Sequence, residues 1–284
     1  MFITLINGFR YRVLVLFLAV FPLSGCIAYF GYGISKANPS APRPTDPPTP
    51  SGTLLKPQLR IGISPDYPPL AFKDARFGLV GIEVELANEV AKQLGKQILF
   101  VETPFPELIK ALLEDRIDII MSGMSVTAER VKLVNFTDSY ALIGQMALVR
   151  TRDASSYPNV QTFWNTTRKV GFVRDTTGEL AARGLFLHAE IVSEPTVEEG
   201  VVALRKGEID VFIHDAPTIW RIAGNPGEQE LKGLYWRLTD EHLAWAVRKD
   251  DEPLRFAINR ELTQIRQSGR LTEILSRWAG LRIW

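Results

Sequence analysis

Residues 117–130 read IDIIMSGMSVTAER, a stretch in which an apolar run is followed by a turn and then by a cation. The run 117–121 predicts a buried strand, and the small residues after it predict a turn around Gly123. Ser125 stands in that turn, and Arg130 follows five residues later. Because ligands of open α/β sheets bind at the carboxyl ends of strands, this turn is a candidate ligand site.

The same alternation of strand and helix continues on both sides of this stretch. The expected strands are 59–63, 98–101, 117–121, 169–173, 191–193 and 211–213, and the expected helices are 81–94, 107–113, 178–185, 196–206 and two within 254–278. Strands that alternate with crossover helices predict parallel sheets. Since the rhythm restarts after residue 168, the sequence predicts an α/β protein with two lobes.

Composition excludes several classes of function. The 284 residues carry 33 basic and 32 acidic side chains, a formal net charge of +1, which argues against a nucleic-acid partner. His188, His214 and His242 share no metal-ligand spacing, and there is one cysteine. We therefore expect no metal site and no cofactor.

The N-terminus has the pattern of an export signal. Arg10 and Arg12 precede the apolar run 13–21, and Leu-Ser-Gly-Cys follows at 23–26. This last stretch resembles a lipobox, so we expect a signal peptide over 1–25 and lipidation of Cys26. The alternative is an uncleaved membrane anchor, because apolar character continues through 27–30. Either reading places the rest of the chain in the periplasm or at the cell exterior, and which membrane holds the anchor stays open.

A linker is expected between the anchor and the folded part. Residues 37–53 read ANPSAPRPTDPPTPSGT, and a stretch so rich in proline and small polar residues forms an extended spacer. We assign residues 26–57 to this lipid-anchored linker.

The residues expected at the strand ends complement a free amino acid. Arg130 can bind a carboxylate with two parallel hydrogen bonds, and Asp215 can accept from an ammonium group. Ser125 and Thr177 offer hydroxyls, while Tyr67 and Phe105 can cover a side chain; Thr176 and Glu179 have capping-box spacing, which predicts free N–H groups of a helix start facing the same anion.

Several motifs together resemble a known family. They are GISPDYPPLAF, GIEVELANEVAKQLG, IDIIMSGMSVTAERVKLVNFTDSY, VGFVRDTTGE, IDVFIHDAP and SGRLTEILSRWAG, in this order over about residues 59–280. The chain resembles the bacterial extracellular solute-binding proteins of family 3, the polar amino-acid-binding proteins of ABC transporters, in a lipoprotein form.

The resemblance implies a two-lobe periplasmic-binding-protein fold of class II. Each lobe would be a β-sheet flanked by helices, with the ligand cleft between the lobes. Lobe 1 would comprise 58–148 and 241–284, and lobe 2 would comprise 149–240, with the chain crossing near 147–151 and 237–244.

The resemblance also implies the roles of the site residues. The carboxylate-binding arginine matches Arg130, and the ammonium-binding acid matches Asp215. The full set of expected ligand contacts is Ser64, Tyr67, Phe105, Gly123, Met124, Ser125, Arg130, Arg174, Thr177, His214 and Asp215. Many members that bind basic or amide side chains carry an acid where this chain has Ser64, so a strong preference for arginine, lysine or histidine is not implied. Arg174 favours an oxygen-bearing side chain.

The implied function is capture of an L-amino acid and its delivery to ABC transporter permease subunits, by a monomer and without catalysis. Some relatives catalyse an elimination, so one alternative is a cyclohexadienyl dehydratase-like enzyme, with Glu107 or Glu179 as general acid. A ligand-sensing accessory protein is the other alternative.

Overall fold

The structure is a computed structural model that describes residues 52–279. The expectations for residues 1–51, namely the signal peptide, lipidation of Cys26 and most of the linker, lie outside the described residues. Over 52–279, no helix is long and apolar enough to cross a membrane.

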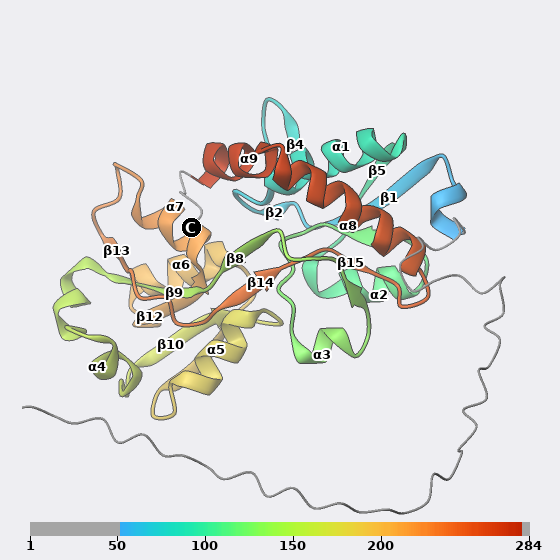
Figure 1. Ribbon diagram of the computed structural model, residues 1–284. Helices are drawn as coiled ribbons and strands as arrows, with labels where there is room; N and C mark the ends of the chain where they lie inside the picture. Colours follow the sequence, from blue (N-terminus) through green and yellow to red (C-terminus); the bar gives the residue numbers. More distant parts are fainter. Residues whose placement is uncertain (1–51, 280–284) are drawn as a thin grey trace, which may run out of the picture. The chain divides into compact units, whose positions relative to one another are not determined.

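The first sheet has the strand order β5-β1-β6-β15-β7 (Figure 1). Its strands are β1 (Gln58–Ile63), β5 (Gln97–Glu102), β6 (Ile119–Ile120), β7 (Asn135–Phe136) and β15 (Ala246–Val247). Strands β5 and β6 run parallel to β1, whereas β15 runs antiparallel to β6 and β7. The predicted run 117–121 thus contains a central strand of the sheet. On either side of β6, the backbone N–H groups of Asp118 and Met121 also donate hydrogen bonds to β1.

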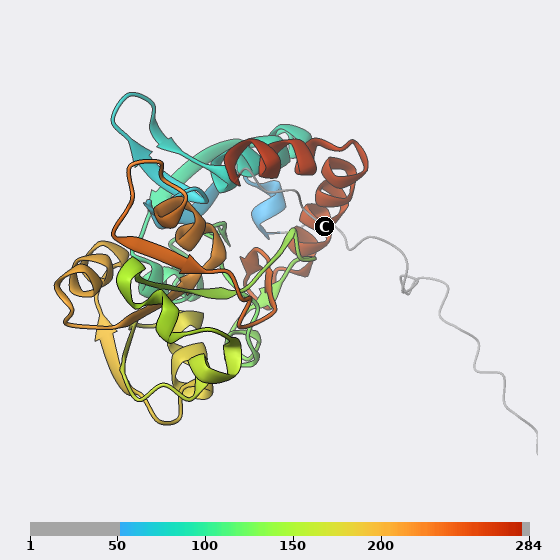
Figure 2. The same cartoon turned by 90° about the vertical axis from the view of Figure 1, so that its left-hand side faces the viewer.

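The helices beside the first sheet come from two distant parts of the sequence. They are α1 (Ile82–Leu94), α2 (Leu108–Leu113), α8 (Glu252–Gln267) and α9 (Arg270–Ala279). In Figures 1 and 2, α8 and α9 lie beside α1, and the three helices contact one another. Helix α1 ends where predicted, because Gly95 adopts the left-handed conformation with φ 64° and closes the last turn.

The second sheet has the order β11-β10-β12-β9-β13. Its strands are β9 (Gln145–Arg150), β10 (Lys169–Val173), β11 (Glu190–Glu194), β12 (Val211–Asp215) and β13 (Leu231–Leu234), and its helices are α4 (Val160–Trp164), α5 (Thr177–Leu185), α6 (Val197–Lys206) and α7 (Ala216–Ala223). Strands β11 and β12 are parallel to β10, as predicted, and β9 is antiparallel to β12 and β13. Thr196 caps α6 by accepting the N–H of Glu199 at 3.1 Å.

A two-stranded antiparallel ladder connects the two sheets. It consists of β8 (Ala141–Ile143) and β14 (Glu241–Leu243). The expected boundary between the lobes lay at 148/149, but β9 already pairs within the second sheet from Gln145 onward. The first crossing is therefore at Gly144, where any Cβ would collide with the carbonyl oxygen of Thr239.

Two further parts of the first lobe differ from the sequence predictions. A small sheet of β2 (Asp66–Tyr67), β3 (Ala71–Asp74) and β4 (Gly78–Val80) was not expected, because its strands are very short. The folded part also begins earlier than the linker assignment 26–57 allows. A 3₁₀ turn, η1 (Gly52–Leu55), buries Thr53, whose hydroxyl donates to the Asp251 carboxylate at 2.5 Å. Assigning residues 52–57 to the linker was therefore wrong.

Candidate functional site

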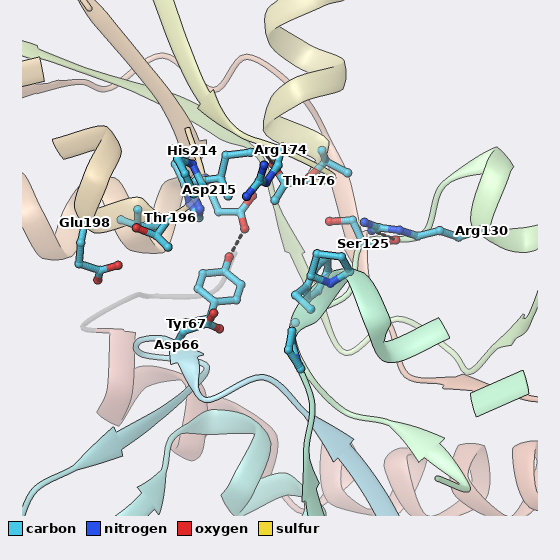
Figure 3. A pocket seen from close by; sticks show the side chains of 18 residues that line it. Asp66, Tyr67, Ser125, Arg130, Arg174, Thr176, Thr196, Glu198, His214 and Asp215 are labelled. Atoms are coloured by element: carbon cyan, nitrogen blue, oxygen red, sulfur yellow. Dashed lines mark hydrogen bonds between the residues drawn. The ribbon is translucent and has the colours of Figure 1, made fainter. Parts of the chain in front are cut away.

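A cavity of about 340 Å³ lies at the carboxyl ends of strands from both sheets. Of the expected ligand contacts it is lined by Tyr67, Phe105, Gly123, Ser125, Arg130, Arg174, Thr177, His214 and Asp215. Figure 3 shows Arg130 at one end, Glu198 at the other, and Tyr67 between them. The topology thus collects residues that are far apart in sequence at one place, as the strand-end rule predicts.

Arg130 provides a cation that has no acidic partner among the residues that the structure describes. It lies in α3 (Ala128–Val131), where the Thr127 hydroxyl caps the helix by accepting the Arg130 N–H at 3.2 Å. Its guanidinium donates to the carbonyl oxygen of Ser125 at 2.9 Å and lies 5.4 Å from the centre of the Phe105 ring. No carboxylate of residues 52–279 lies within 4.0 Å of it, and burial lowers its pKa. A partly buried guanidinium in this setting favours an anionic ligand.

Gly123 serves the loop differently from what we expected. Its φ of 65° and the adjacent side chains of Leu70 and Tyr67 leave no room for a Cβ. Its N–H, however, donates to the buried carboxylate of Glu83 and does not face the cavity. Glu83 also accepts a hydrogen bond from the Tyr140 hydroxyl at 2.7 Å, so this carboxylate holds the loop 122–130 in place.

Ser125 joins the cavity to the ladder between the sheets. Its hydroxyl donates to the Glu241 carboxylate at 2.7 Å, in a buried contact. Its backbone forms a bridge with Leu243 of β14. The Ser125 proton is therefore already used within the protein, and only its oxygen remains for a ligand.

Asp215 provides the acid on the opposite side of the cavity. It ends β12 and precedes α7, so its carboxylate leaves the sheet at the strand end. The Tyr67 hydroxyl and the Gln145 side-chain amide both donate to it, and Figure 3 shows the first of these bonds. Burial is the main cause that raises its pKa, and the charge of Glu241 acts in the same direction.

His214 lies beside Asp215 and is buried. Its Nδ1 accepts the backbone N–H of Asp215 at 2.8 Å. Its ring meets the Tyr67 ring edge-on, with 5.8 Å between the ring centres. Burial lowers the pKa of His214.

The start of α5 does not contain the predicted capping box. The Thr176 hydroxyl donates to the Val173 carbonyl oxygen at 2.6 Å and caps nothing. Glu179 instead accepts the N–H of Asp175 at 3.0 Å and pairs with Arg183 at 2.8 Å. The interpretation as a capping box was wrong, because Thr176 is held by the strand that precedes it. Thr176 and Thr177 nevertheless line the cavity.

Two expected ligand contacts lie outside the cavity. Ser64 is buried, and its hydroxyl donates to the Asp66 carboxylate at 2.7 Å. Asp66 itself lines the cavity, although it was not among the expected ligand contacts. Met124 is buried in the apolar cluster that contains Leu108 and Ile120. Its side chain thus packs in the core of the first lobe.

Two further residues of the site carried no motif that would have identified them. Glu198, in the first turn of α6, lines the cavity, and no basic side chain of the described chain lies within 4.0 Å of it or of Asp66. Gln145 does not line the cavity but donates to Asp215, and it was missed because a glutamine at the start of a strand has no distinctive pattern. Over residues 52–279 there is no cluster of three or more histidine, cysteine or acidic side chains that could hold a metal ion.

A two-lobe α/β fold with a charged cavity at the strand ends defines a solute-binding protein of the class II periplasmic-binding fold. The chain belongs to the bacterial extracellular solute-binding proteins, family 3, because the model of that family matches residues 59–281. The family inferred from the motifs is thereby confirmed, whereas its lipoprotein form stays a prediction.

Three similar proteins illustrate the relationship. The histidine-binding periplasmic protein of Salmonella typhimurium is 30% identical over 234 residues, covering 78% of this chain and 87% of that protein. A binding component of an ABC transporter from Wolinella succinogenes, complexed with lysine, is 32% identical, with a TM-score of 0.75 over 79% of this chain and 97% of that one. An ancestral amino acid-binding protein, a precursor of cyclohexadienyl dehydratase, is 31% identical, with a TM-score of 0.72 over 78% and 96%.

Proposed function

We propose that this protein captures an L-amino acid between its two lobes and delivers it to an ABC transporter permease. One observation carries the proposal: a guanidinium with no acidic partner among residues 52–279 and a partly buried carboxylate line the same cavity. Arg130 would bind the ligand carboxylate in two parallel hydrogen bonds, and Asp215 would accept from the ligand ammonium. Tyr67 and Phe105 would enclose the ligand side chain.

The far end of the cavity supports a cationic side chain. Glu198 lies at the end opposite Arg130 and Asp66 lies beside Tyr67 (Figure 3), and neither carboxylate has a basic partner in the described chain. Counting Arg130 and Arg174 against Asp66, Glu198 and Asp215 leaves an excess of negative charge, which a ligand of net charge +1 would balance. The absence of an acid at position 64 is thus offset by Asp66. The relatives named for histidine and complexed with lysine point the same way.

An amino acid can supply the affinity that uptake requires. A micromolar dissociation constant corresponds to about −8 kcal/mol. A ligand of about ten heavy atoms reaches this value within known limits of ligand efficiency. The cavity therefore needs no interactions beyond charge pairing and contact with aromatic rings.

The membrane attachment belongs to the same proposal. Lipidation of Cys26 would anchor the chain in the periplasm or at the cell exterior, and the proline-rich stretch before η1 would act as the tether. The periplasmic location in the name of the Salmonella relative supports an extracytoplasmic location. We expect the protein to act as a monomer.

The two general acids considered for the dehydratase alternative are not placed for that role. That reaction needs a general acid in the cavity. Glu107 and Glu179 do not line it, and the hydrogen bond from Arg183 is the main cause that lowers the pKa of Glu179. A lowered pKa favours the ionised form, which cannot donate a proton.

A thermal-shift screen of the full-length chain in detergent against the twenty standard L-amino acids tests the proposal. A ligand at 100 times its dissociation constant should stabilise the folded protein by about 2.7 kcal/mol. We expect the largest shifts with arginine, lysine or histidine. The absence of a shift with all twenty would refute amino-acid capture, and turnover of prephenate or arogenate would instead establish the enzyme.

A further inference from the structure

Gln145 lies at the centre of the hydrogen bonds behind the cavity. Its side-chain nitrogen approaches three acceptors: a carboxylate oxygen of Asp215, the Thr177 hydroxyl at 3.2 Å and the Glu241 carboxylate at 3.1 Å. The residue is completely buried, with an exposed fraction of 0%. A fully buried amide that contacts two residues of the ligand cavity holds them in a fixed relation.

The Glu241 carboxylate accepts several hydrogen bonds beside the ladder β8–β14. It accepts from Ser125 at 2.7 Å and from Thr239 at 2.7 Å, in addition to Gln145. It belongs to β14, which pairs with β8 where the chain passes between the sheets. The carboxylate therefore stands where the two halves of the molecule join.

Together these contacts form one continuous path. It runs from Ser125 in the first-lobe loop to Glu241, then to Gln145, and from there to Asp215 and Thr177 in the second lobe. Each step is a hydrogen-bond contact between side chains, and because the Gln145 amide nitrogen has two protons, one proton is shared between two of its three acceptors. The path thus connects the two faces of the cavity without passing through the cavity itself.

The electrostatics of this path complement the ligand. Asp215 and Glu241 share one neutral amide, and within residues 52–279 no basic side chain lies within 4.0 Å of either carboxylate. Hydrogen bonds from an amide stabilise the two charges but do not neutralise them. The ammonium of an amino acid bound at Asp215 would supply the missing positive charge to both.

We propose, resting on the amino-acid-binding function above, that Gln145 and Glu241 are positioning residues that couple the two halves of the site through the ladder β8–β14. Gln145 orients Asp215 and Thr177, and Glu241 ties this pair to Ser125 and adds a second negative charge behind the ammonium. Closure of the lobes on a ligand then places both halves together.

The neighbouring hydrogen bonds of Glu83, in contrast, do not connect the two lobes. Glu83 is also buried and holds the same loop through Gly123, yet its other donors are Tyr140 and Trp245. None of these three residues lies in the second sheet. Glu83 therefore supports the loop alone, whereas Glu241 reaches the second lobe through Gln145.

A double-mutant cycle on ligand affinity tests the coupling. The probe is the tightest-binding of the twenty standard L-amino acids, and affinities are measured by calorimetry for Ser125→Ala, Thr177→Val and the double variant. The same cycle is repeated in a Gln145→Leu background. We expect the two losses to deviate from additivity by at least threefold in the otherwise native chain, and to become additive once Gln145 is replaced.

Matched variants separate positioning from general destabilisation. Glu241→Gln keeps the shape and should weaken binding about tenfold, which corresponds to 1.4 kcal/mol. Glu261→Gln changes a buried glutamate of α8 that pairs with Arg260 and should leave affinity within twofold. If Gln145→Leu does not fold, Glu241→Gln provides the second background for the cycle.

Each result of these experiments either supports or overturns a proposal. Coupling that disappears in the altered background supports the proposal. Additive losses in the native background, coupling that survives loss of Gln145, or equal effects of Glu241→Gln and Glu261→Gln overturn it. A native chain that binds none of the amino acids overturns the proposed function instead, and is recognised before any variant is made.

Discussion

The two halves of the cavity differ in whether their charged groups already have partners. The first-lobe half comes from three segments, residues 66–67, 104–106 and the loop 122–130, and its cation Arg130 has no acidic partner in the described chain. The second-lobe half comes from residues 173–177 at the end of β10, 195–198 after β11 and 214–215 at the end of β12, and its acid Asp215 already accepts two hydrogen bonds. One half is therefore open to a ligand, while the other is internally satisfied.

This difference implies unequal contributions to binding. A ligand carboxylate at Arg130 forms hydrogen bonds that the free protein lacks. A ligand ammonium at Asp215 has to replace or join the Tyr67 hydroxyl, so part of its gain is cancelled. We therefore expect the carboxylate half to contribute more to the measured affinity than the ammonium half.

Replacing Arg130 should have the largest effect. Removing one partner of a buried charge pair costs roughly 2–5 kcal/mol, so Arg130→Ala should weaken binding of the amino acid at least about 30-fold in calorimetry. Arg168→Ala is the matched control, because Arg168 lies over the Tyr157 ring and outside the cavity. Equal affinity for Arg130→Ala and the native chain would refute its assignment.

Replacing Asp215 should have a smaller effect. Asp215→Asn keeps the shape of the side chain but loses its charge, and we expect binding to weaken about tenfold, near 1.4 kcal/mol. The control is Asp240→Asn, because Asp240 is an exposed residue that pairs with Arg237. A loss as large as that of Arg130→Ala would contradict the inequality between the two halves.

The same acid should affect the stability of the unliganded protein. Since burial raises the folded pKa of Asp215 above its ordinary 3.8, the folded state holds this proton to higher pH than the unfolded state. Ionisation of Asp215 therefore lowers stability as pH rises from 3.8 through the folded pKa. Thermal unfolding of Asp215→Asn and native chains over this range should show the variant gaining stability relative to native as pH rises, and a constant difference would contradict it.

The smallest expected effect concerns the bond between the lobes. Tyr67→Phe removes the hydroxyl that occupies Asp215 in the free protein but keeps the ring that covers the ligand. We expect amino-acid binding to become two- to fivefold tighter, because a typical hydrogen bond contributes about 0.5–1.5 kcal/mol. Weaker binding by Tyr67→Phe would show that the hydroxyl contacts the ligand directly. Phe72→Leu serves as a control outside the cavity.

Local pattern was sufficient to predict the elements that carry their own signal. The helix 82–94 follows from the spacing of its apolar residues and from Gly95, and the strands 58–63, 169–173 and 211–215 follow from short apolar runs. The loop at 122–130 was recognisable because its residues are contiguous. Its neighbours β2 to β4 were missed because strands of two to four residues carry too little pattern.

The rest of the site depends on contacts between distant segments. Gln145 and Glu241 are 96 positions apart, and their hydrogen bond exists only once β8 and β14 pair. Ser64 and Asp66 were misjudged for a related reason. Which of two nearby polar residues faces a cavity depends on the turn between β1 and β2, and sequence spacing does not determine its geometry.

The backbone hydrogen bond at His214 has a further chemical consequence. A backbone N–H can only donate, so Nδ1, which accepts it, must be the unprotonated nitrogen, and the ring carries its proton on Nε2. A second proton would have to enter at Nδ1 and would break this bond, in a place where burial already lowers the pKa. His214 therefore stays neutral with its proton on Nε2, and it cannot act as a pH sensor beside Asp215.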